Sequence, residues 1–282
     1  MNIGVIYDIV RWEEKAIIEA IRDKGHKPIL FHVDSLSFKI SSKIDFNNID
    51  IAIQRCVSYY KALTSTLIFE ENSVYVVNPS PTLTLCSNKL QTTLRLAKNG
   101  IPVPETYIAF TKEQASKIPR KLGYPIVLKP ILGSWGRLLA KVNDDDALSA
   151  VFEHRDYMYN PIYRIYYIQE YINKPGRDVR VFTIGDEVPV AIYRVSKHWK
   201  TNTALGGKAV KAEVTDELRD LAFKTSKAIG GGILGIDILE DPKRGFLVNE
   251  VNAVIEFRNT VRVTGVKLQS LIVDYLIKEA RR

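Results

Sequence analysis

Three oxygen-bearing side chains near the C-terminus have the types and spacing of a divalent-cation site. Glu250 and Asn252 stand two apart in an expected strand at 246–252, so they share a face. A turn centred between Lys243 and Arg244 would place Asp237, on the preceding strand, directly opposite Glu250. Facing carboxylates repel unless a cation joins them, and an all-oxygen set suits Mg²⁺ that carries phosphates. The alternative is a pair of solvated acids at a sheet edge, but the apolar neighbours favour the metal.

A second segment could bind phosphate. Lys129 ends an expected strand at 125–130, and a glycine-bearing loop over Gly133–Arg137 follows it. Glycines let backbone N–H groups approach phosphate oxygens, while lysine supplies a point charge. The segment is not a Walker A loop, because Gly136–Arg137 replaces Gly-Lys-Ser/Thr. An ordinary glycine hairpin with an exposed lysine explains this segment equally well.

The elements that must position these residues divide into two patterns. Over the first hundred residues, strands at 3–7, 28–33, 49–53 and 74–77 alternate with helical segments, which predicts a parallel, doubly wound α/β sheet. Gly4 stands alone where a dinucleotide fingerprint needs three glycines, so a Rossmann NAD site is not expected.

Residues 99–104 form a stiff, proline-containing connection, beyond which the pattern becomes α+β. Strands are predicted at 125–130, 138–142, 165–172, 178–184, 188–195, 233–239 and 246–252. Helices are predicted at 144–154 and 217–229, with a closing helix over 268–276.

Composition narrows the class of protein. The chain has 282 residues, 46% of them hydrophobic, which excludes a disordered protein, and no segment is apolar enough to span a membrane. Two cysteines give no disulfide framework, and the N-terminal segment lacks a secretion signal, so a cytoplasmic protein is expected. The net charge of +8 attracts anionic substrates or an acidic partner. Nucleic-acid binding is a minority alternative, because basic and acidic residues are interleaved throughout.

These residues in this order resemble the ATP-grasp ligases, particularly their RimK-like branch, over nearly the whole chain. The resemblance implies an N-terminal βαβ (pre-ATP-grasp) domain at 1–87, a central lobe with the glycine loop at 88–168, and a C-terminal lobe with the metal site at 169–282. The two lobes would clasp ATP. The residues that carry the resemblance are Lys89, Lys129, Gly133–Arg137, Gln169–Ile172, Arg180, Arg194, Asn202, Asp237 and Glu250–Asn252.

The resemblance also implies a role for each matched position. The nucleotide would be held by Lys89, Lys129, Gly133, Ser134, Trp135, Gly136, Arg137, Gln169, Glu170, Tyr171, Ile172, Arg177, Asp178, Arg180 and Asn202. The catalytic contacts to phosphates, acyl phosphate or substrate would come from Arg180, Arg194 and Asn202. Mg²⁺, as two ions, would be bound by Asp237, Glu250 and Asn252. Amide synthesis through an acyl phosphate needs cations that stabilise delocalised negative charge, and it needs no protein nucleophile. The histidines are scattered along the sequence, which agrees with a mechanism without a nucleophile–histidine pair.

Within the branch, residues 251–260 resemble the LysX/ArgX group. These ligases attach an amino acid's α-amino group to the C-terminal glutamate γ-carboxylate of the acidic carrier protein LysW. The group's substrate residues would be Arg194, Glu256, Phe257, Arg258, Asn259 and Thr260. Asn259 and Thr260 favour glutamate, in arginine biosynthesis, over α-aminoadipate, in lysine biosynthesis, although an enzyme for α-aminoadipate or for both remains open. The further alternatives are a ligase that adds glutamate to a ribosomal protein and a non-catalytic RNA-binding module. The resemblance also implies a homo-oligomer, a tetramer.

Overall fold

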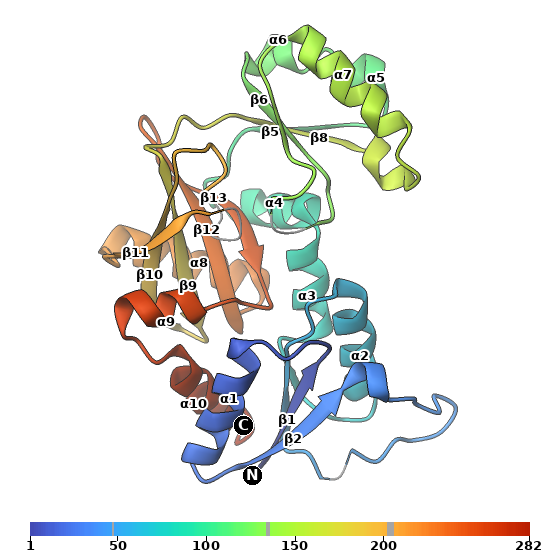
Figure 1. Cartoon of the computed structure of the whole chain (residues 1–282), viewed down its shortest axis with the longest axis vertical. Coiled ribbons are helices and arrows are strands. Elements are labelled where there is room, and N and C mark those ends of the chain that lie inside the picture. The colour runs from blue at the N-terminus through green and yellow to red at the C-terminus, as the bar shows by residue number, and fades with distance from the viewer. Residues whose placement is uncertain (47, 134–135, 202–205) are drawn as a thin grey trace.

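The computed structural model describes residues 1–46, 48–133, 136–201 and 206–282, and its strands form three sheets (Figure 1). The first sheet lies near the N-terminus, the second forms a separate lobe at the other end of the long axis, and the third stands beside helices that join the two. The domain boundaries at 87/88 and 168/169 remain predictions, and one strand of the central sheet, residues 166–170, crosses the second of them.

The N-terminal sheet is parallel, as the βαβ pattern predicts, with strand order β2-β1-β3-β4. Its elements are β1 (Asn2–Tyr7), α1 (Trp12–Asp23), β2 (Lys27–His32), η1 (Val33–Ser35), β3 (Ile51–Gln54), α2 (Tyr59–Glu71) and β4 (Val76–Val77). Gly4 has a packing role, because a Cβ there would lie 3.0 Å from the Cβ of Ala52 on the neighbouring strand.

Two helices then lead out of this domain: α3 (Ser80–Ser87) and α4 (Lys89–Lys98). The first of these helices begins at Ser80. Pro81 lies in the first turn of that helix, where its missing N–H costs no hydrogen bond. The Asn88 side chain caps α4 by accepting the backbone N–H groups of Leu90 and Gln91.

The central lobe is an antiparallel sheet with order β5-β8-β6-β7 and a core of its own, built around Ile126, Leu128, Phe152 and Ile168. Helices cover it at the top of Figure 1. Its elements are β5 (Thr106–Ala109), α5 (Lys112–Ala115), α6 (Pro119–Leu122), β6 (Ile126–Lys129), β7 (Ala140–Val142), α7 (Asp145–Asp156), η2 (Pro161–Arg164) and β8 (Tyr166–Glu170).

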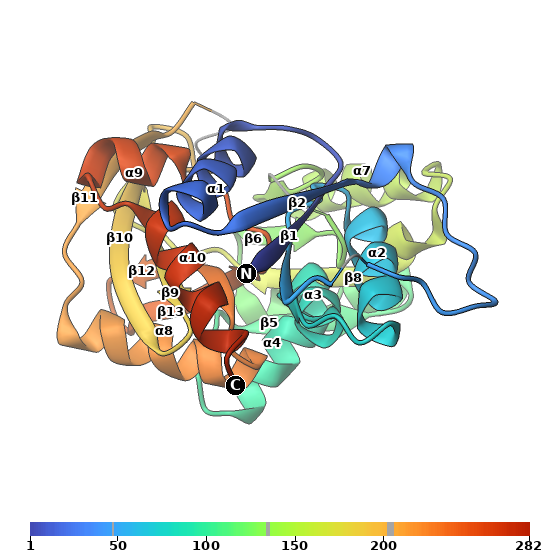
Figure 2. The same cartoon turned by 90° about the horizontal axis from the view of Figure 1, so that it is seen from below.

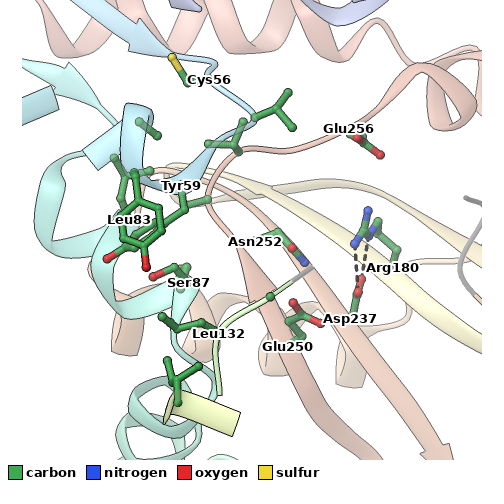
Figure 3. Close-up of a pocket in the computed structure, with 18 of the residues that line it drawn as sticks. Cys56, Tyr59, Leu83, Ser87, Leu132, Arg180, Asp237, Glu250, Asn252 and Glu256 are labelled. Atoms are coloured by element: carbon green, nitrogen blue, oxygen red, sulfur yellow. Dashed lines mark hydrogen bonds and ion pairs between the residues drawn. The ribbon is translucent and has the colours of Figure 1, made fainter. Parts of the chain in front are cut away.

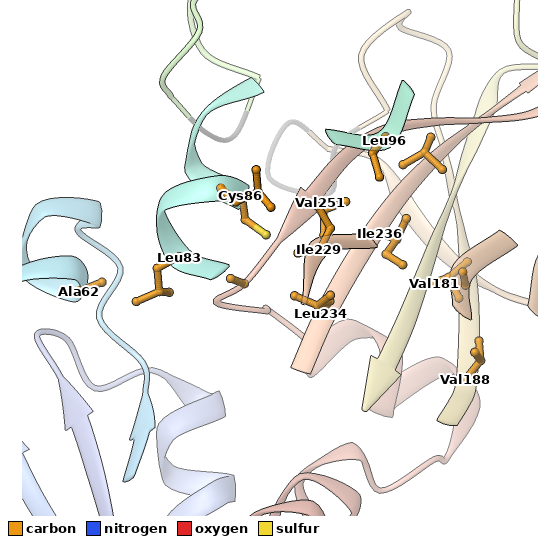
Figure 4. Close-up of a cluster of buried hydrophobic side chains, with 14 of the residues drawn as sticks. Ala62, Leu83, Cys86, Leu96, Val181, Val188, Ile229, Leu234, Ile236 and Val251 are labelled. Carbon is orange, nitrogen blue, oxygen red and sulfur yellow. The ribbon is translucent and has the colours of Figure 1, made fainter. Parts of the chain in front are cut away.

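The C-terminal sheet is antiparallel with order β11-β10-β9-β12-β13. Its elements are β9 (Arg177–Ile184), β10 (Glu187–Val195), β11 (Lys208–Ala212), α8 (Asp216–Ile229), β12 (Ile233–Asp241), β13 (Gly245–Asn252), α9 (Arg258–Thr264) and α10 (Leu268–Glu279). One sheet face, with Val181, Ile236 and Val251, packs in one apolar cluster with Leu96 of α4 and Ile229 of α8 (Figure 4).

The last helix returns to the beginning of the chain. Leu268, Ile272 and Leu276 of α10 are fully buried in one cluster with Ile3 of β1 and Ile17 of α1. Figure 2 shows α10 running beside α1. The same cluster includes Phe182 and Ile184 of β9, so the first and third sheets share a core.

None of the helices in the described part of the chain is both long and apolar enough to cross a membrane.

Candidate active site

The β12–β13 hairpin brings the predicted metal ligands together. Asp237 pairs with Glu250, as the sequence predicts, and Gly235 pairs with Asn252. The predicted turn centre is wrong by half a residue, because Asp241 pairs with Gly245 and the turn is therefore centred on Lys243. A β-bulge between the 238–248 and 237–250 pairs inserts one extra residue on β13 and restores the predicted pairing.

Asn249 is the extra residue of this bulge, and the sequence analysis did not single it out. The bulge breaks the strand alternation, so Asn249 and Glu250 both remain partly exposed between the buried Val248 and Val251. The Oδ1 atom of Asn249 accepts a hydrogen bond of 2.7 Å from Nζ of Lys129. The signal that could reveal it is the pair of adjacent polar residues in an otherwise alternating strand.

Lys129 is buried at the end of β6, so it is not the exposed lysine of an ordinary hairpin. Its Nζ donates to Oε1 of Gln169 at 2.6 Å as well as to Asn249. Burial lowers the pKa of Lys129 to about 7. The negative charge of Glu250 raises this pKa, and the positive charge of Lys89 lowers it further, but burial has the largest effect. A lysine that is half neutral near pH 7 gains its full charge when an anion approaches.

Lys89, in the first turn of α4, is a second buried lysine of the site. Its side chain is 8% exposed, and its Nζ donates to the carbonyl of Gly133 at 2.5 Å. The same Nζ lies 3.6 Å from Oε1 of Glu250. Lys89 therefore joins the start of the glycine loop to the predicted metal site.

Arginine–carboxylate pairs extend the site across the face of the sheet. Arg180 binds Asp237 through two hydrogen bonds of 2.7 and 2.9 Å, drawn in Figure 3. Arg194 binds Asp178 in the same way, and its Nη2 also lies 3.1 Å from Oδ2 of Asp237. The strand register explains this arrangement, because Asp237 pairs with Arg180 and Arg194 pairs with Asp178 on adjacent strands.

These contacts keep the cluster charged despite its burial. Burial alone would raise the pKa of Asp237, but the Arg180 and Arg194 guanidinium groups outweigh it and hold that pKa below its usual value. Burial likewise opposes the charge of Arg194, yet Asp237 and Asp178 raise its pKa further. The site therefore offers fixed positive charge beside an ionised carboxylate.

Two adjoining cavities contain these residues. The larger has a volume of about 470 Å³, and its lining includes Arg180, Arg194, Asp237, Glu250 and Asn252. Figure 3 shows the side chains of Arg180, Asp237, Glu250 and Asn252 near one another. The smaller has a volume of about 80 Å³. Its lining includes the predicted nucleotide residues Lys89, Lys129, Gly133, Gly136, Gln169, Glu170, Tyr171, Ile172 and Asp178. Asp237, Glu250, Arg194 and Gly133 line both cavities, so the two form one continuous site.

The lining of the smaller cavity also includes residues that are not among the predicted site residues. Lys174 donates to Thr201 at 2.7 Å and to Asp178 at 3.4 Å, and burial lowers its pKa. Trp199 and Lys200 line the cavity too, and Nζ of Lys200 donates to the carbonyl of Gly136 at 3.1 Å. The basic and aromatic residues at 197–200 are a sequence signal that could have identified this segment.

The remaining predicted residues fall elsewhere. Ser134, Trp135 and Asn202 lie outside the described residues. Arg137 is exposed, and Arg177 forms two hydrogen bonds with Glu240 on the neighbouring strand. Glu256 lines the larger cavity, but Phe257, Arg258, Asn259 and Thr260 are not among the described residues that line either one.

The structure places the predicted substrate segment 257–260 at the start of a short helix. Phe257 is buried against Trp12, and Arg258 begins α9. Thr260 is buried within α9, and Asn259 is exposed. The two predicted specificity residues thus occupy a short helix.

The residues present suit Mg²⁺. Asp237, Glu250 and Asn252 supply two carboxylates and one amide oxygen, the hard ligands that Mg²⁺ prefers. Asn252 donates through Nδ2 to the carbonyl of Gly235 at 3.4 Å, which leaves its oxygen available. In the described part of the chain, no group of three or more His, Cys, Asp or Glu residues could hold a metal, so the amide completes the set.

Both cysteines are free and buried, as expected of inert thiols. Burial raises the pKa of Cys56 to about 12 and that of Cys86 above its usual range, so neither supplies a nucleophile near neutral pH.

Comparisons with known proteins identify the family of the chain. The family model of the RimK-like ATP-grasp domain matches residues 86–276, and that of the LysX preATP-grasp domain matches residues 3–85. An RimK-domain ATP-grasp protein from Sphaerobacter thermophilus has the same fold, with a TM-score of 0.81, 23% identity, and 98% of this chain and 100% of that chain covered.

Two relatives from Sulfurisphaera tokodaii carry more detailed names. The α-aminoadipate–LysW ligase LysX is 46% identical over 282 residues, covering 99% of this chain and 98% of the relative. The glutamate–LysW ligase ArgX is 34% identical over 278 residues, covering 98% of each. The chain therefore belongs to the RimK-like ATP-grasp family, in its LysX/ArgX group, and is an ATP-dependent carboxylate–amine ligase.

Proposed function

We propose that this ligase joins the α-amino group of α-aminoadipate to the C-terminal glutamate γ-carboxylate of the carrier protein LysW, in lysine biosynthesis. The observation that carries the proposal is the identity of 46% to an α-aminoadipate–LysW ligase, against 34% to a glutamate–LysW ligase of the same organism. The glutamate reaction that Asn259 and Thr260 favour becomes the second candidate. It keeps the support of a relative that covers 98% of the chain.

The smaller cavity is the proposed nucleotide site. Val127, Ile172 and Leu239 supply apolar surface for a base, and Lys89, Lys129 and Lys174 supply positive charge for phosphates. Its volume of about 80 Å³ is less than a nucleotide requires, so we expect the central lobe to move away from β12 and β13 when ATP enters.

The metal ligands would be Asp237, Glu250 and Asn252. Bound Mg²⁺ would neutralise phosphate charge during phosphoryl transfer. The binding of two Mg²⁺ ions remains a prediction.

The chain's own residues then account for the remaining requirements of amide synthesis. The buried lysines hold the triphosphate, and Arg180 and Arg194 present fixed guanidinium groups to the oxygens that gain charge as the carrier carboxylate becomes an acyl phosphate. The larger cavity, which opens beside these arginines, holds the amino acid so that its uncharged amine can attack the acyl carbon and release phosphate. The lobes exclude water, which would otherwise hydrolyse the intermediate.

The acidic carrier complements the net charge of +8. A tetrameric assembly remains a prediction from the family resemblance.

A direct assay tests the proposal. Purified chain, ATP, Mg²⁺ and LysW are incubated with α-aminoadipate or with glutamate, and the carrier is measured by intact mass spectrometry. We expect one amino-acid addition per carrier and a higher kcat/KM for α-aminoadipate. A higher kcat/KM for glutamate would instead establish the second candidate, and no addition with either amino acid would refute both.

A further inference from the structure

Arg11, immediately before α1, is held by one buried carboxylate, that of Glu14. Its Nη2 and Nε atoms donate to the two carboxylate oxygens of Glu14 at 2.8 and 3.1 Å. Glu14 is fully buried and also accepts a hydrogen bond of 3.0 Å from Arg55, which is itself 2% exposed. Two guanidinium groups therefore share one buried carboxylate, and the geometry of Arg11 is set before any ligand arrives.

The segment that follows the predicted metal strand is fixed to the same helix. Glu13 accepts the backbone N–H groups of Phe257 and Arg258 at 3.1 and 3.0 Å, and Arg55 donates to the carbonyl of Ile255 at 2.9 Å. Glu256 lies between these anchored residues. The N-terminal domain thus determines where the Glu256 side chain projects.

The remaining nitrogen of the Arg11 guanidinium, Nη1, reaches the larger cavity. It lies 3.2 Å from Oε1 of Glu256, and the two side chains are 21% and 43% exposed. Both residues line the cavity that also contains Asp237 and Glu250. In Figure 3, Glu256 stands apart from the Asp237–Glu250 pair, so the two groups occupy different parts of one cavity.

We propose that Arg11 binds the distal carboxylate of the incoming amino acid, in the place that the Glu256 carboxylate now occupies. This inference rests on the proposed function, because it assumes an amino-acid substrate with a side-chain carboxylate. The amine that attacks the acyl phosphate and the α-carboxylate share one carbon, so both must lie near Arg180 and Arg194. The distal carboxylate is the group that can reach the opposite wall, where Arg11 offers a preorganised hydrogen-bond donor.

The proposal assigns a specificity role to the N-terminal domain. A dicarboxylic amino acid would displace an exposed carboxylate from Nη1, at the cost of only a several-fold loss of affinity because Glu256 can turn to solvent. An amino acid without a distal charge would leave the Arg11–Glu256 pair unbroken. The longer α-aminoadipate reaches further toward Arg11 than glutamate does, which agrees with the proposed preference.

The test compares two substrates with the same carbon chain. In the carrier assay, kcat/KM is measured for α-aminoadipate and for 2-aminohexanoate, which lacks the distal carboxylate, with wild-type chain, Arg11→Gln and Arg22→Gln. We expect Arg11→Gln to lower the preference for α-aminoadipate by roughly 10- to 100-fold, the usual effect of a charged hydrogen bond, with little change for 2-aminohexanoate. Arg22, exposed at the other end of α1, is the matched control and should leave the preference unchanged.

A second variant has the opposite expected sign and does not remove the anchored arginine. Glu256→Gln weakens the competitor for Nη1, so KM for α-aminoadipate should fall several-fold while KM for 2-aminohexanoate stays constant. An unchanged preference in Arg11→Gln, an equal loss on both substrates, or a higher KM for both in Glu256→Gln would overturn the assignment. A wild-type chain that adds neither α-aminoadipate nor glutamate to the carrier would overturn the proposed function itself, whereas these outcomes leave it standing.

Discussion

Lys129 is an ammonium group enclosed by protein, and its protonation should control nucleotide affinity. Its pKa of about 7 in the free protein means that the side chain is charged below pH 7 and neutral above it. ATP binds the charged form, so we expect affinity to fall as pH rises above 7, by up to about tenfold per pH unit. Calorimetric titration between pH 6 and 9, in buffers of different ionisation enthalpy, should show proton uptake on binding.

The matched control for this titration is Lys129→Arg, because a guanidinium stays charged over the whole range. Its profile should reflect only the titration of ATP and of the other groups in the cavity, such as Lys174, whose pKa burial also lowers. If the wild-type and Lys129→Arg profiles coincide, the protonation of Lys129 does not govern binding.

Asp237 and Glu250 face each other but have different contacts. Replacing each carboxylate with the corresponding amide should therefore have different effects on stability. Glu250→Gln should abolish Mg²⁺-dependent ligation, by at least about 100-fold, with an unchanged melting temperature, because its side chain is 23% exposed. Asp237→Asn should also lose activity and be destabilised by about 3–5 kcal/mol, since Arg180 and Arg194 lose a buried counter-charge. Ligation assays and thermal melts of both variants check this, and full activity in Glu250→Gln would reject the metal assignment.

At the level of elements, the β13 bulge lets one strand serve two functions. Glu250 stays opposite Asp237, and Asn249 accepts a hydrogen bond from Lys129. Deletion of Asn249 should keep Asp237 opposite Glu250, because the flanking pairs then become continuous, while Lys129 loses an acceptor. We expect a folded protein with ATP affinity lowered about 10- to 100-fold, the value of one hydrogen bond to a charged group. Asn249→Ala is the comparison: if its ATP affinity falls equally, the bulge serves to supply this acceptor. Equal ATP affinity in wild type and deletion would show that it does not.

The hairpin also illustrates how far sequence reasoning reaches. Alternation and turn residues were enough to predict that Asp237 and Glu250 pair, because strand pairing is a local property of a hairpin. The bulge could not be predicted, since the turn centre was misjudged by half a residue and the inserted residue compensated for it. The Arg194–Asp178 and Arg180–Asp237 pairs depend on registers between strands that are distant in sequence, and so does the Arg11–Glu256 contact. Short elements such as β5, α5, α6 and β11 were missed because they carry too few residues for a periodic signal.

At the scale of the whole molecule, the separate hydrophobic cores predict that the central lobe can unfold locally without the other two sheets, which share a core. The central lobe has a separate core around Leu128, whereas Leu276 of α10 lies in a cluster with β1 and β9. Leu128→Ala should therefore accelerate amide exchange in the central lobe alone. Leu276→Ala should accelerate exchange in both the N-terminal and C-terminal sheets, at a cost of about 2–5 kcal/mol.

Hydrogen exchange followed by mass spectrometry measures these responses peptide by peptide. Leu268→Ala, at another fully buried position of α10, should reproduce the Leu276→Ala pattern. Faster exchange confined to α10 itself in these variants would show that the shared cluster does not join the two sheets energetically.

The packing of α10 against the N-terminal domain also affects how the chain folds during translation. The apolar face of α1 that α10 covers is translated early, and its cover is translated after both lobes. While the chain is still attached to the ribosome, Ile17 and Ile3 lack part of their partners, and the nascent N-terminal domain exposes an apolar surface throughout. We therefore expect a nascent-chain chaperone to bind this face during translation. The chaperone should be released once residues 268–279 emerge from the exit tunnel and cover the face.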